Sequence, residues 1–486
     1  MPAINTNVSA LHGLVNLNRA EADLNEASQR LSSGKKLNSA ADDAAGLAIA
    51  TRMTSQITSL NMAMKNTNDG ISMLTTVESA LGEISNMLQR MRELAVQSGN
   101  DINSGKDRGY LQDEINQFKT EITSISTNTE FNGSNVLDGT LSSKVIQTGM
   151  NSGQSITFSV DNVASSVLGS YTYTGTARAT LAAAATPAAN STTADADILI
   201  HGNSVSKTID VAANDQASTV AAAINAETGS TGVTASAKSY AKLLSTAATA
   251  TYSLKINGTS TGNMSIGSAS VGDAVTKINQ IKGTTGVTAS ASSDGTFVTL
   301  YHSGGEDITV ENESAGTDLD VYAIAFDGTT VSGAKQDLAA TAGNDAVKVI
   351  GNVKLSSSRS FSVTQSGTTG YFTTGSASLS AVSNVDIKTV AGASSAIDTI
   401  DGALEKVLSM RSKLGALQNR LERTINRLTT SVTSTEEARS RIVDADYALE
   451  TTRLTKAKIM QQASTAMLAQ ANQSKQNILT LLNIFF

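Results

Sequence analysis

The sequence predicts an α+β fold, in which a long α-helical coiled-coil rod built from both termini carries an inserted β-rich outer region. Apolar residues follow heptad spacing near both ends of the chain, which is typical of helices that pack side by side. Pro2 and Pro187 are the only prolines, so long helices are not interrupted. The middle of the chain is rich in Thr, Ser, Gly and Val, and alternating segments such as SITFSV favour strands there.

Two long helices are expected at the start of the chain. The first carries an apolar seam over residues 10–31 in steps of three and four, and Gly34 is expected to end it. The second extends from about residue 43 to residue 97 and keeps heptad spacing over residues 50–95. A pattern of this length is typical of a coiled coil.

A third helix is predicted from about residue 105 to residue 128. Ser104 and Asp107 precede it with the spacing of an N-terminal capping pair. Asn132 and Gly133 follow the helix, and this dipeptide between short apolar segments predicts a β-hairpin.

At the other end, an apolar seam over residues 397–432 predicts a long helix, and Ser434 with Glu437 predicts a capping box that restarts it. The last segment, residues 446–486, has a seam of its own, formed by Leu449, Thr452, Ile459, Ala463, Ala466, Ile478, Leu481 and Phe485. This narrow stripe buries too little surface to order the segment alone. We therefore expect the last helix to pack against other helices, from this chain or from copies of it.

The middle region contains an internal repeat, residues 198–237 and 254–291, and the segment TGVTASA begins identically at Thr231 and Thr285. Each copy is expected to form a strand, a Gly turn, a strand, a short helix, a Thr-Gly turn and a strand. This order fits a small α+β module.

Composition excludes several function classes. The formal net charge of −7 and the pI near 5.2 argue against a nucleic-acid partner. No apolar stretch reaches the length of a membrane-spanning helix, so we expect no membrane insertion. The N-terminus lacks a basic leader followed by an apolar run, so export would not use a cleaved Sec-type signal peptide.

Catalysis is not expected either. Cysteine is absent, which excludes disulfides and thiolate metal sites. The histidines are His12, His201 and His302, and no HExxH motif occurs. No Gly-rich phosphate loop follows a predicted strand. The sequence therefore predicts neither an enzyme nor a cofactor.

Both ends of the chain resemble bacterial flagellin, the subunit of the flagellar filament. The segments that carry this resemblance are LSSGKKLNSAADDAAGLAIA (31–50), QRMRELAVQ (89–97), EFNGSNVLDG (130–139) and RIVDADYALETTRLTKAKIMQQASTAMLAQANQSKQNIL (441–479). The repeated unit is similar to a module that is inserted in many flagellins and hook-associated proteins.

The resemblance implies three regions. Residues 1–42 with 446–486 would form a terminal coiled coil, the inner core of a filament. Residues 43–175 with 350–445 would form a helical rod with short β-hairpins, the outer core. Residues 176–349 would form the inserted variable domain or domains.

The resemblance also implies a structural, non-enzymatic subunit that polymerises for swimming motility and is found outside the cell, in the bacterial flagellum. Copies would join through the terminal coiled coil, at Leu17, Leu24, Leu31, Leu449, Ile459, Ala463, Ile478, Leu481 and Leu482. Other implied partners are an export chaperone that binds the C-terminal helix, and the hook-associated junction and cap proteins.

A further implied partner is Toll-like receptor 5 of animals. The matching positions lie on the second and third predicted helices, at Gln89, Arg90, Glu93, Leu94 and Glu114. The alternative for these residues is a solvated helix face or a subunit contact.

Two other functions remain open at this point. A hook–filament junction protein would share the coiled-coil ends but would connect instead of polymerising. A secreted adhesin would use the inserted repeats to bind a ligand. Long filaments in electron micrographs of the purified protein are expected for the filament subunit alone.

Overall fold

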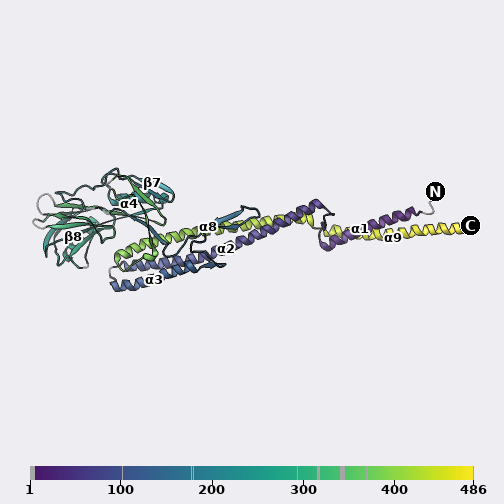
Figure 1. The fold of residues 1–486 in the computed structure, drawn as a ribbon, viewed down its shortest axis with the longest axis horizontal. Helices are drawn as coiled ribbons and strands as arrows, with labels where there is room; N and C mark the ends of the chain where they lie inside the picture. The colour runs from purple at the N-terminus through teal and green to yellow at the C-terminus, as the bar shows by residue number, and fades with distance from the viewer. Residues whose placement is uncertain are drawn as a thin grey trace. The chain divides into compact units, whose positions relative to one another are not determined.

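The chain forms long helices near both ends and a β-rich region between them (Figure 1). A computed structural model describes residues 6–484, apart from 101, 177, 179, 293, 315–317, 340–344 and 368–369, and it describes side chains as far as residue 474. The long helices are α1 (Val8–Ser33), α2 (Ala44–Ser98), α3 (Gly105–Asn128), α8 (Val390–Val443) and α9 (Tyr447–Ile484). The predicted α+β class is confirmed.

The chain divides into two compact units, and α2 and α8 contribute to both. The first, here called the terminal unit, comprises Met1–Leu74, Ser143–Phe158 and Ala416–Phe486. The second, here called the β unit, comprises Thr75–Ser142 and Ser159–Gly415.

In the terminal unit, α2 and α8 pack along the apolar seams that the sequence predicts. Ile57, Leu60, Ala63, Leu428 and Val432 form one buried cluster. Ile57 and Leu60 on α2, and Leu428 and Val432 on α8, follow one another by three or four residues, as expected for a heptad seam, and Ala63 lies beside them.

The predicted helix restart at Ser434 is wrong. Helix α8 continues to Val443, and Ser434 lies exposed within it. Asp446 instead caps α9, because its Oδ1 accepts hydrogen bonds from the backbone N–H groups of Ala448 and Leu449 at 2.9 and 3.2 Å. No proline or glycine interrupts α8 near Ser434, so the local capping pattern does not end the helix.

A short hairpin packs against α2 in the terminal unit. Its strands are β3 (Lys144–Gln147) and β4 (Ser155–Phe158), paired antiparallel. A Cβ atom on Gly70 of α2 would collide with the side chain of Ile146. Glycine at this helix position therefore allows the hairpin to approach the helix backbone.

In the β unit, α2 and α8 are joined by a charged contact within their apolar seam. Arg411 Nε lies 2.8 Å from Glu78 Oε1, and both side chains are about one-third exposed. Leu81 and Val407, close by in sequence, are fully buried. A charged pair at one level of an apolar seam favours a single alignment of the two helices.

The start of α3 and the turn after it agree with the sequence. The Ser104 side chain accepts a hydrogen bond from the backbone N–H of Asp107, and the Asp107 carboxylate accepts one from the backbone N–H of Ser104. Strands β1 (Glu130–Phe131) and β2 (Ser134–Asn135) flank a turn with positive φ at its two central residues. The capping box and the hairpin are confirmed.

The internal repeat folds as two modules with the same order of elements. The first comprises β6 (Ile198–Gly202), β7 (Val205–Ile209), α4 (Ala217–Ala226), α5 (Thr228–Thr231) and β8 (Thr234–Leu244). The second comprises β9 (Ala250–Ile256), β10 (Thr259–Ile266), α6 (Gly272–Gln280), α7 (Lys282–Thr285) and β11 (Val287–Ala291). The predicted order of elements is confirmed in both.

The two modules also share one side-chain contact. In the first, Asn225 at the end of α4 accepts from the N–H of Ala235 and donates to its carbonyl, at 2.7 and 2.9 Å. In the second, Asn279 makes the same two bonds to Ala289, both at 2.9 Å. Each asparagine therefore ties the helix of its module to the last strand.

The modules contribute strands to three antiparallel sheets. The largest has the strand order β11-β12-β8-β17-β5-β20, with β14 also paired to β8 and β15 paired to β14. The other two have the orders β10-β9-β13-β16 and β19-β18-β6-β7. The remaining strands are β5 (Gly169–Thr174), β12 (Phe297–His302), β13 (Ile308–Asn312), β14 (Leu319–Ile324), β15 (Val331–Leu338), β16 (Ala346–Val349), β17 (Asn352–Ser357), β18 (Ser362–Gln365), β19 (Gly375–Ser376) and β20 (Ser378–Ala381).

The helices of the two modules pack into different hydrophobic clusters. Val220 and Ile224 of α4 lie in one buried cluster, and Ala274 and Ile278 of α6 lie in another.

The asparagine contacts give the first testable prediction. Asn225→Ala should speed hydrogen exchange at the Ala235 amide, and Asn279→Ala should do so at the Ala289 amide, because each loses a bond worth about 1 kcal/mol. Exchange measured by NMR or mass spectrometry should rise about fivefold at the matching strand alone. Each variant is the control for the other, and equal acceleration at both strands would contradict the assignment.

Candidate functional site

Helices α1 and α9 lie side by side and run antiparallel (Figure 1). Three contacts show their direction: Arg30 with Glu450, Glu21 with Gln461, and Asn7 with Ala471. The two ends of the chain therefore meet in a single helix pair, as the sequence predicts.

Small residues form the centre of this pair. Ala20 and Ala27 on α1 are 5% and 3% exposed, and Ala457 and Ser464 on α9 are 5% and 8% exposed. Gly13 approaches Leu468 so closely that a Cβ atom there would lie 3.0 Å from the leucine Cδ1 atom. The helices thus approach closely but bury little apolar surface.

The predicted interface residues of α1 face its partner within the same chain. Leu17, Leu24 and Leu31 are half-buried at the edges of the seam with α9. They pack inside one molecule and keep part of their surface exposed.

The predicted interface residues of α9 face away from α1. Leu449 is 49% exposed, Ile459 is 58% exposed, and Ala463 is also exposed. Ile478, Leu481 and Leu482 lie outside the residues whose side chains are described.

A different stripe of α9 contacts α1, and sequence reasoning missed it. It consists of the more buried positions of the helix, Glu450, Leu454, Ala457, Gln461, Ser464, Leu468 and Ala471. These positions also follow steps of four and three residues, which is the signal that could have identified them. Five of the seven side chains are small or polar, which lowers the hydrophobicity of the stripe, so the neighbouring stripe of larger residues was selected instead.

Large apolar side chains therefore remain exposed on both helices. On α1 these are Val8, Leu11, Leu14 and Val15, with exposed fractions between 45% and 54%. On α9 they are Leu449, Ile459, Met460 and Met467, with exposed fractions between 49% and 68%. We call these eight residues the outer apolar face. Apolar patches of this kind are typical of protein–protein interfaces.

The α1–α2 connection and the α8–α9 connection are hydrogen-bonded to one another. The N–H of Lys36 donates to the carbonyl of Val443 at 2.7 Å, and the N–H of Ala445 donates to the carbonyl of Gly34 at 3.0 Å. Gly34 adopts a positive φ of 66°. The α1–α2 and α8–α9 connections thus satisfy backbone groups that the helix ends leave unpaired.

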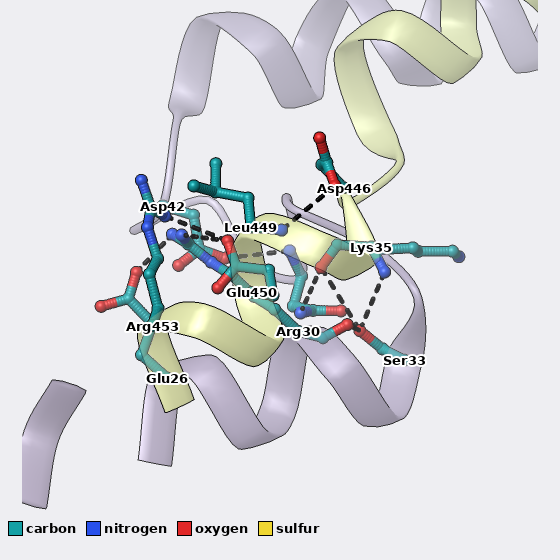
Figure 2. Close-up of polar contacts among 10 residues, drawn as sticks. Glu26, Arg30, Ser33, Lys35, Asp42, Asp446, Leu449, Glu450 and Arg453 are labelled. Atoms are coloured by element: carbon teal, nitrogen blue, oxygen red, sulfur yellow. Dashed lines mark hydrogen bonds and ion pairs between the residues drawn. The ribbon is translucent and has the colours of Figure 1, made fainter. Parts of the chain in front are cut away.

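A charged cluster lies next to these two connections (Figure 2). Arg30 contacts Glu26 on its own helix and lies 3.5 Å from Oε1 of Glu450 on α9. Arg453 donates to the same oxygen at 3.0 Å. Glu450 is 3% exposed, and its Oε2 atom and the Arg30 Nε atom have no hydrogen-bond partner among the described residues. Such a buried pair favours one alignment of the helices more than it adds stability.

This cluster gives the second prediction. Glu450→Ala should weaken the pairing of α1 with α9 by about 1–3 kcal/mol, because Arg30 loses its carboxylate across the pair. Hydrogen exchange of the α1 amides in the monomer would report the change.

The matched control is the double variant Arg30→Leu with Glu450→Leu, which removes both charges. It should protect α1 better than Glu450→Ala does. Equal loss of protection in the single and double variants would show that the charge pair does not act as described.

The predicted receptor residues are only partly brought together. Arg90 donates to Glu93 at 2.9 Å and to Glu114 of α3 at 3.1 Å, and Gln89 beside it is exposed. These hydrogen bonds, first that with Glu93, raise the pKa of the Arg90 guanidinium. The group is therefore an exposed ion-pair cluster across α2 and α3.

Leu94 differs from its predicted neighbours. It is 1% exposed and belongs to the buried side of α2, next to the fully buried Met91 and Ala95. Its expected place on a receptor-binding surface is wrong for this structure, since its side chain packs inside the β unit.

Among the described residues, no group of His, Cys, Asp or Glu side chains is placed to hold a metal ion. No described helix combines the length and apolar character needed to cross a membrane.

Known protein families match both ends of the chain. The bacterial flagellin N-terminal helical region matches residues 4–142, and the bacterial flagellin C-terminal helical region matches residues 397–482. The flagellin hook IN motif matches residues 197–249, which cover the first repeated module. B-type flagellin of Pseudomonas aeruginosa is 37% identical over 497 residues, which cover 99% of each chain. The chain belongs to the bacterial flagellin family.

Other flagellins match over the same extent. Flagellin B of Vibrio cholerae is 34% identical over 484 residues, again 99% of each chain. Among solved structures, FliC from Burkholderia pseudomallei is 20% identical, with a TM-score of 0.31, and the match covers 72% of this chain and 99% of that one.

The flagellin match settles the general function. The chain is a structural subunit that polymerises into the bacterial flagellar filament outside the cell. Matches to flagellins along its full length favour this reading over a hook–filament junction protein.

Proposed function

We propose that copies of this flagellin join through the outer apolar face of the α1–α9 pair. The observation that supports the proposal is the contrast between the two sides of each helix. The inner seam contains alanine, serine and glycine, whereas the larger side chains Leu11, Ile459 and Met467 are exposed. A single chain leaves this apolar surface in water, and neighbouring copies would bury it.

The geometry of such contacts suits an open polymer. The outer apolar face includes residues from both α1 and α9. The α1 residues of one copy can therefore contact the α9 residues of the next copy, so the same surface need not pair with itself. Contacts between different surfaces of identical subunits produce a helix when they do not close into a ring. In this scheme, residues 1–42 with 446–486 form the inner core of the filament, residues 43–175 with 350–445 form the outer core, and residues 176–349 form the variable region.

The third prediction tests the outer apolar face. Ile459→Asp should stop seeded polymerisation or slow it more than tenfold, because it would bury an unpaired carboxylate between copies. Elongation can be followed by light scattering and electron microscopy. Ile459→Val keeps the position apolar and should polymerise at close to the original rate. Normal filaments from Ile459→Asp would contradict the proposed interface.

Before assembly, the outer apolar face would have to be shielded from water by a binding partner. We infer that the subunit is exported unfolded through the flagellar channel and that a chaperone in the cell binds the C-terminal helix. Leu449, Ile459, Met460 and Met467 would give the chaperone an apolar stripe. Hook-associated junction and cap proteins are the expected partners at the two ends of the filament.

Recognition of the monomer by Toll-like receptor 5 is a second proposed function. The exposed cluster of Arg90, Glu93 and Glu114 supports it, because arginine is enriched among interface hot spots. Gln89 lies beside this cluster. Leu94 would act only by keeping α2 packed.

The fourth prediction concerns this cluster. Arg90→Ala monomer should lose about tenfold in potency in a receptor reporter assay, as expected for a hot-spot arginine. Arg52→Ala, at an exposed arginine elsewhere on α2, is the control and should keep full potency. An unchanged response to Arg90→Ala would remove Arg90 from the proposed receptor contact.

A further inference from the structure

An open groove lies between α8 and the β3–β4 hairpin of the terminal unit, with a volume of about 780 Å³. Its lining is mixed and includes the cationic side chains Arg420, Arg423 and Arg427 beside the mostly buried Leu60, Ile156 and Leu428. We call it the arginine groove. It is separate from the outer apolar face of α1 and α9.

The three arginines form one stripe along α8. Arg423 and Arg427 follow Arg420 by three and seven residues, which places them on the same side of the helix. All three are exposed, and no hydrogen bond or ion pair within the described part of the chain involves their guanidinium groups. By contrast, Arg411 and Arg441 of the same helix contact Glu78 and Glu437.

Unpaired arginines side by side are unfavourable for the isolated chain. Like charges three or four residues apart on a helix repel by about 0.2–0.5 kcal/mol per pair. The arginines also line a groove instead of a convex surface, so the stripe differs from an ordinary solvated helix face.

The opposite wall of the groove is held in place. Ile146 of the hairpin packs over Gly70 of α2, and the Asn66 side chain donates to the carbonyl of Gln147 at 3.4 Å. The groove is therefore built between fixed elements, which reduces the entropy cost of binding.

The lining specifies the chemistry of an occupant. Guanidinium groups recognise carboxylates through paired N–H donors. We propose that the arginine groove docks an acidic segment of a second copy of this chain. The subunit carries a formal charge of −7, so carboxylates are in excess elsewhere on its surface. The proposal rests on the filament function, because assembly brings the second copy to the groove.

A charge series tests the proposal in the full chain. Arg423→Glu with Arg427→Glu should slow seeded elongation about tenfold at low ionic strength, and added NaCl should reduce the difference, because salt screens charges across an interface. Arg423→Lys with Arg427→Lys keeps the charge and should elongate much faster than the glutamate variant.

The matched control is Arg52→Glu with Lys65→Glu, which reverses two exposed cations of α2 outside the groove. This control changes the net charge by the same amount. The proposal is overturned if the groove variant elongates normally, or if the control slows to the same extent.

A cross-linking experiment identifies the occupant. The chain contains no cysteine, so Met150→Cys places a single thiol in the groove, at a position that is 43% exposed in the original protein. A photoreactive cross-linker on this thiol should join different copies in filaments, at a peptide that contains Asp or Glu. Mixing ¹⁵N-labelled with unlabelled subunits distinguishes links between copies from links within one. Links confined to a single copy, or none in filaments, would overturn the proposal.

The two assembly proposals fail in distinguishable ways. Loss of polymerisation in Ile459→Asp should persist at all salt concentrations, because it arises from burying a charge in an apolar contact. The defect of the groove variant should depend on salt. Normal polymerisation of Ile459→Asp with a salt-sensitive groove defect would reject the first interface and retain the second.

Discussion

Close approach of α1 and α9 through small residues determines how the ends of this flagellin behave. Ala20, Ala27, Ala457 and Ser464 allow the helix axes to lie near one another, but they remove little apolar surface from water. Larger side chains would bury more area but would hold the helices further apart. The two helices thus pack closely but leave apolar side chains exposed to water. Burying these side chains between copies would be favourable.

Charged contacts add to this weak seam because they favour one alignment of the two facing helices. Glu450 with Arg30 does so in the α1–α9 pair, and Glu78 with Arg411 does so between α2 and α8. A long heptad seam of similar apolar residues can slide by one repeat at small cost, and a charge opposite an apolar residue opposes that shift. Each subunit can therefore present its outer surfaces at fixed positions, which a regular polymer requires.

Much of this architecture could be predicted from the sequence. Heptad spacing located the long helices, the Asn-Gly dipeptide located a hairpin, and TGVTASA located the repeated modules. The errors arose where two patterns competed. Helix α9 has two stripes at heptad spacing, and hydrophobicity selected the one with Ile459, whereas α1 packs against the one with Ala457. The sequence does not state which stripe meets a partner in the same chain.

Other differences have local causes. Leu94 follows the fully buried Met91 by three residues and precedes the fully buried Ala95, so it lies on the buried side of α2 although the resemblance indicated a surface role. Ser434 matches a helix-start pattern, but nothing nearby stops α8. The arginine groove could not be predicted, because its lining combines α2, α8 and a hairpin that approaches α2 at Gly70.

The bonded connections at Gly34–Lys36 and Val443–Ala445 have a consequence for proteolysis. A single cut in the 38–42 connection would leave α1 joined to the rest of the molecule only by non-covalent contacts. In a free subunit those contacts bury little apolar surface, so the cleaved segment would dissociate and the remaining fragment would lack half of its terminal pair. Within a filament, neighbouring copies would retain the same segment, and one nick would leave the structure intact.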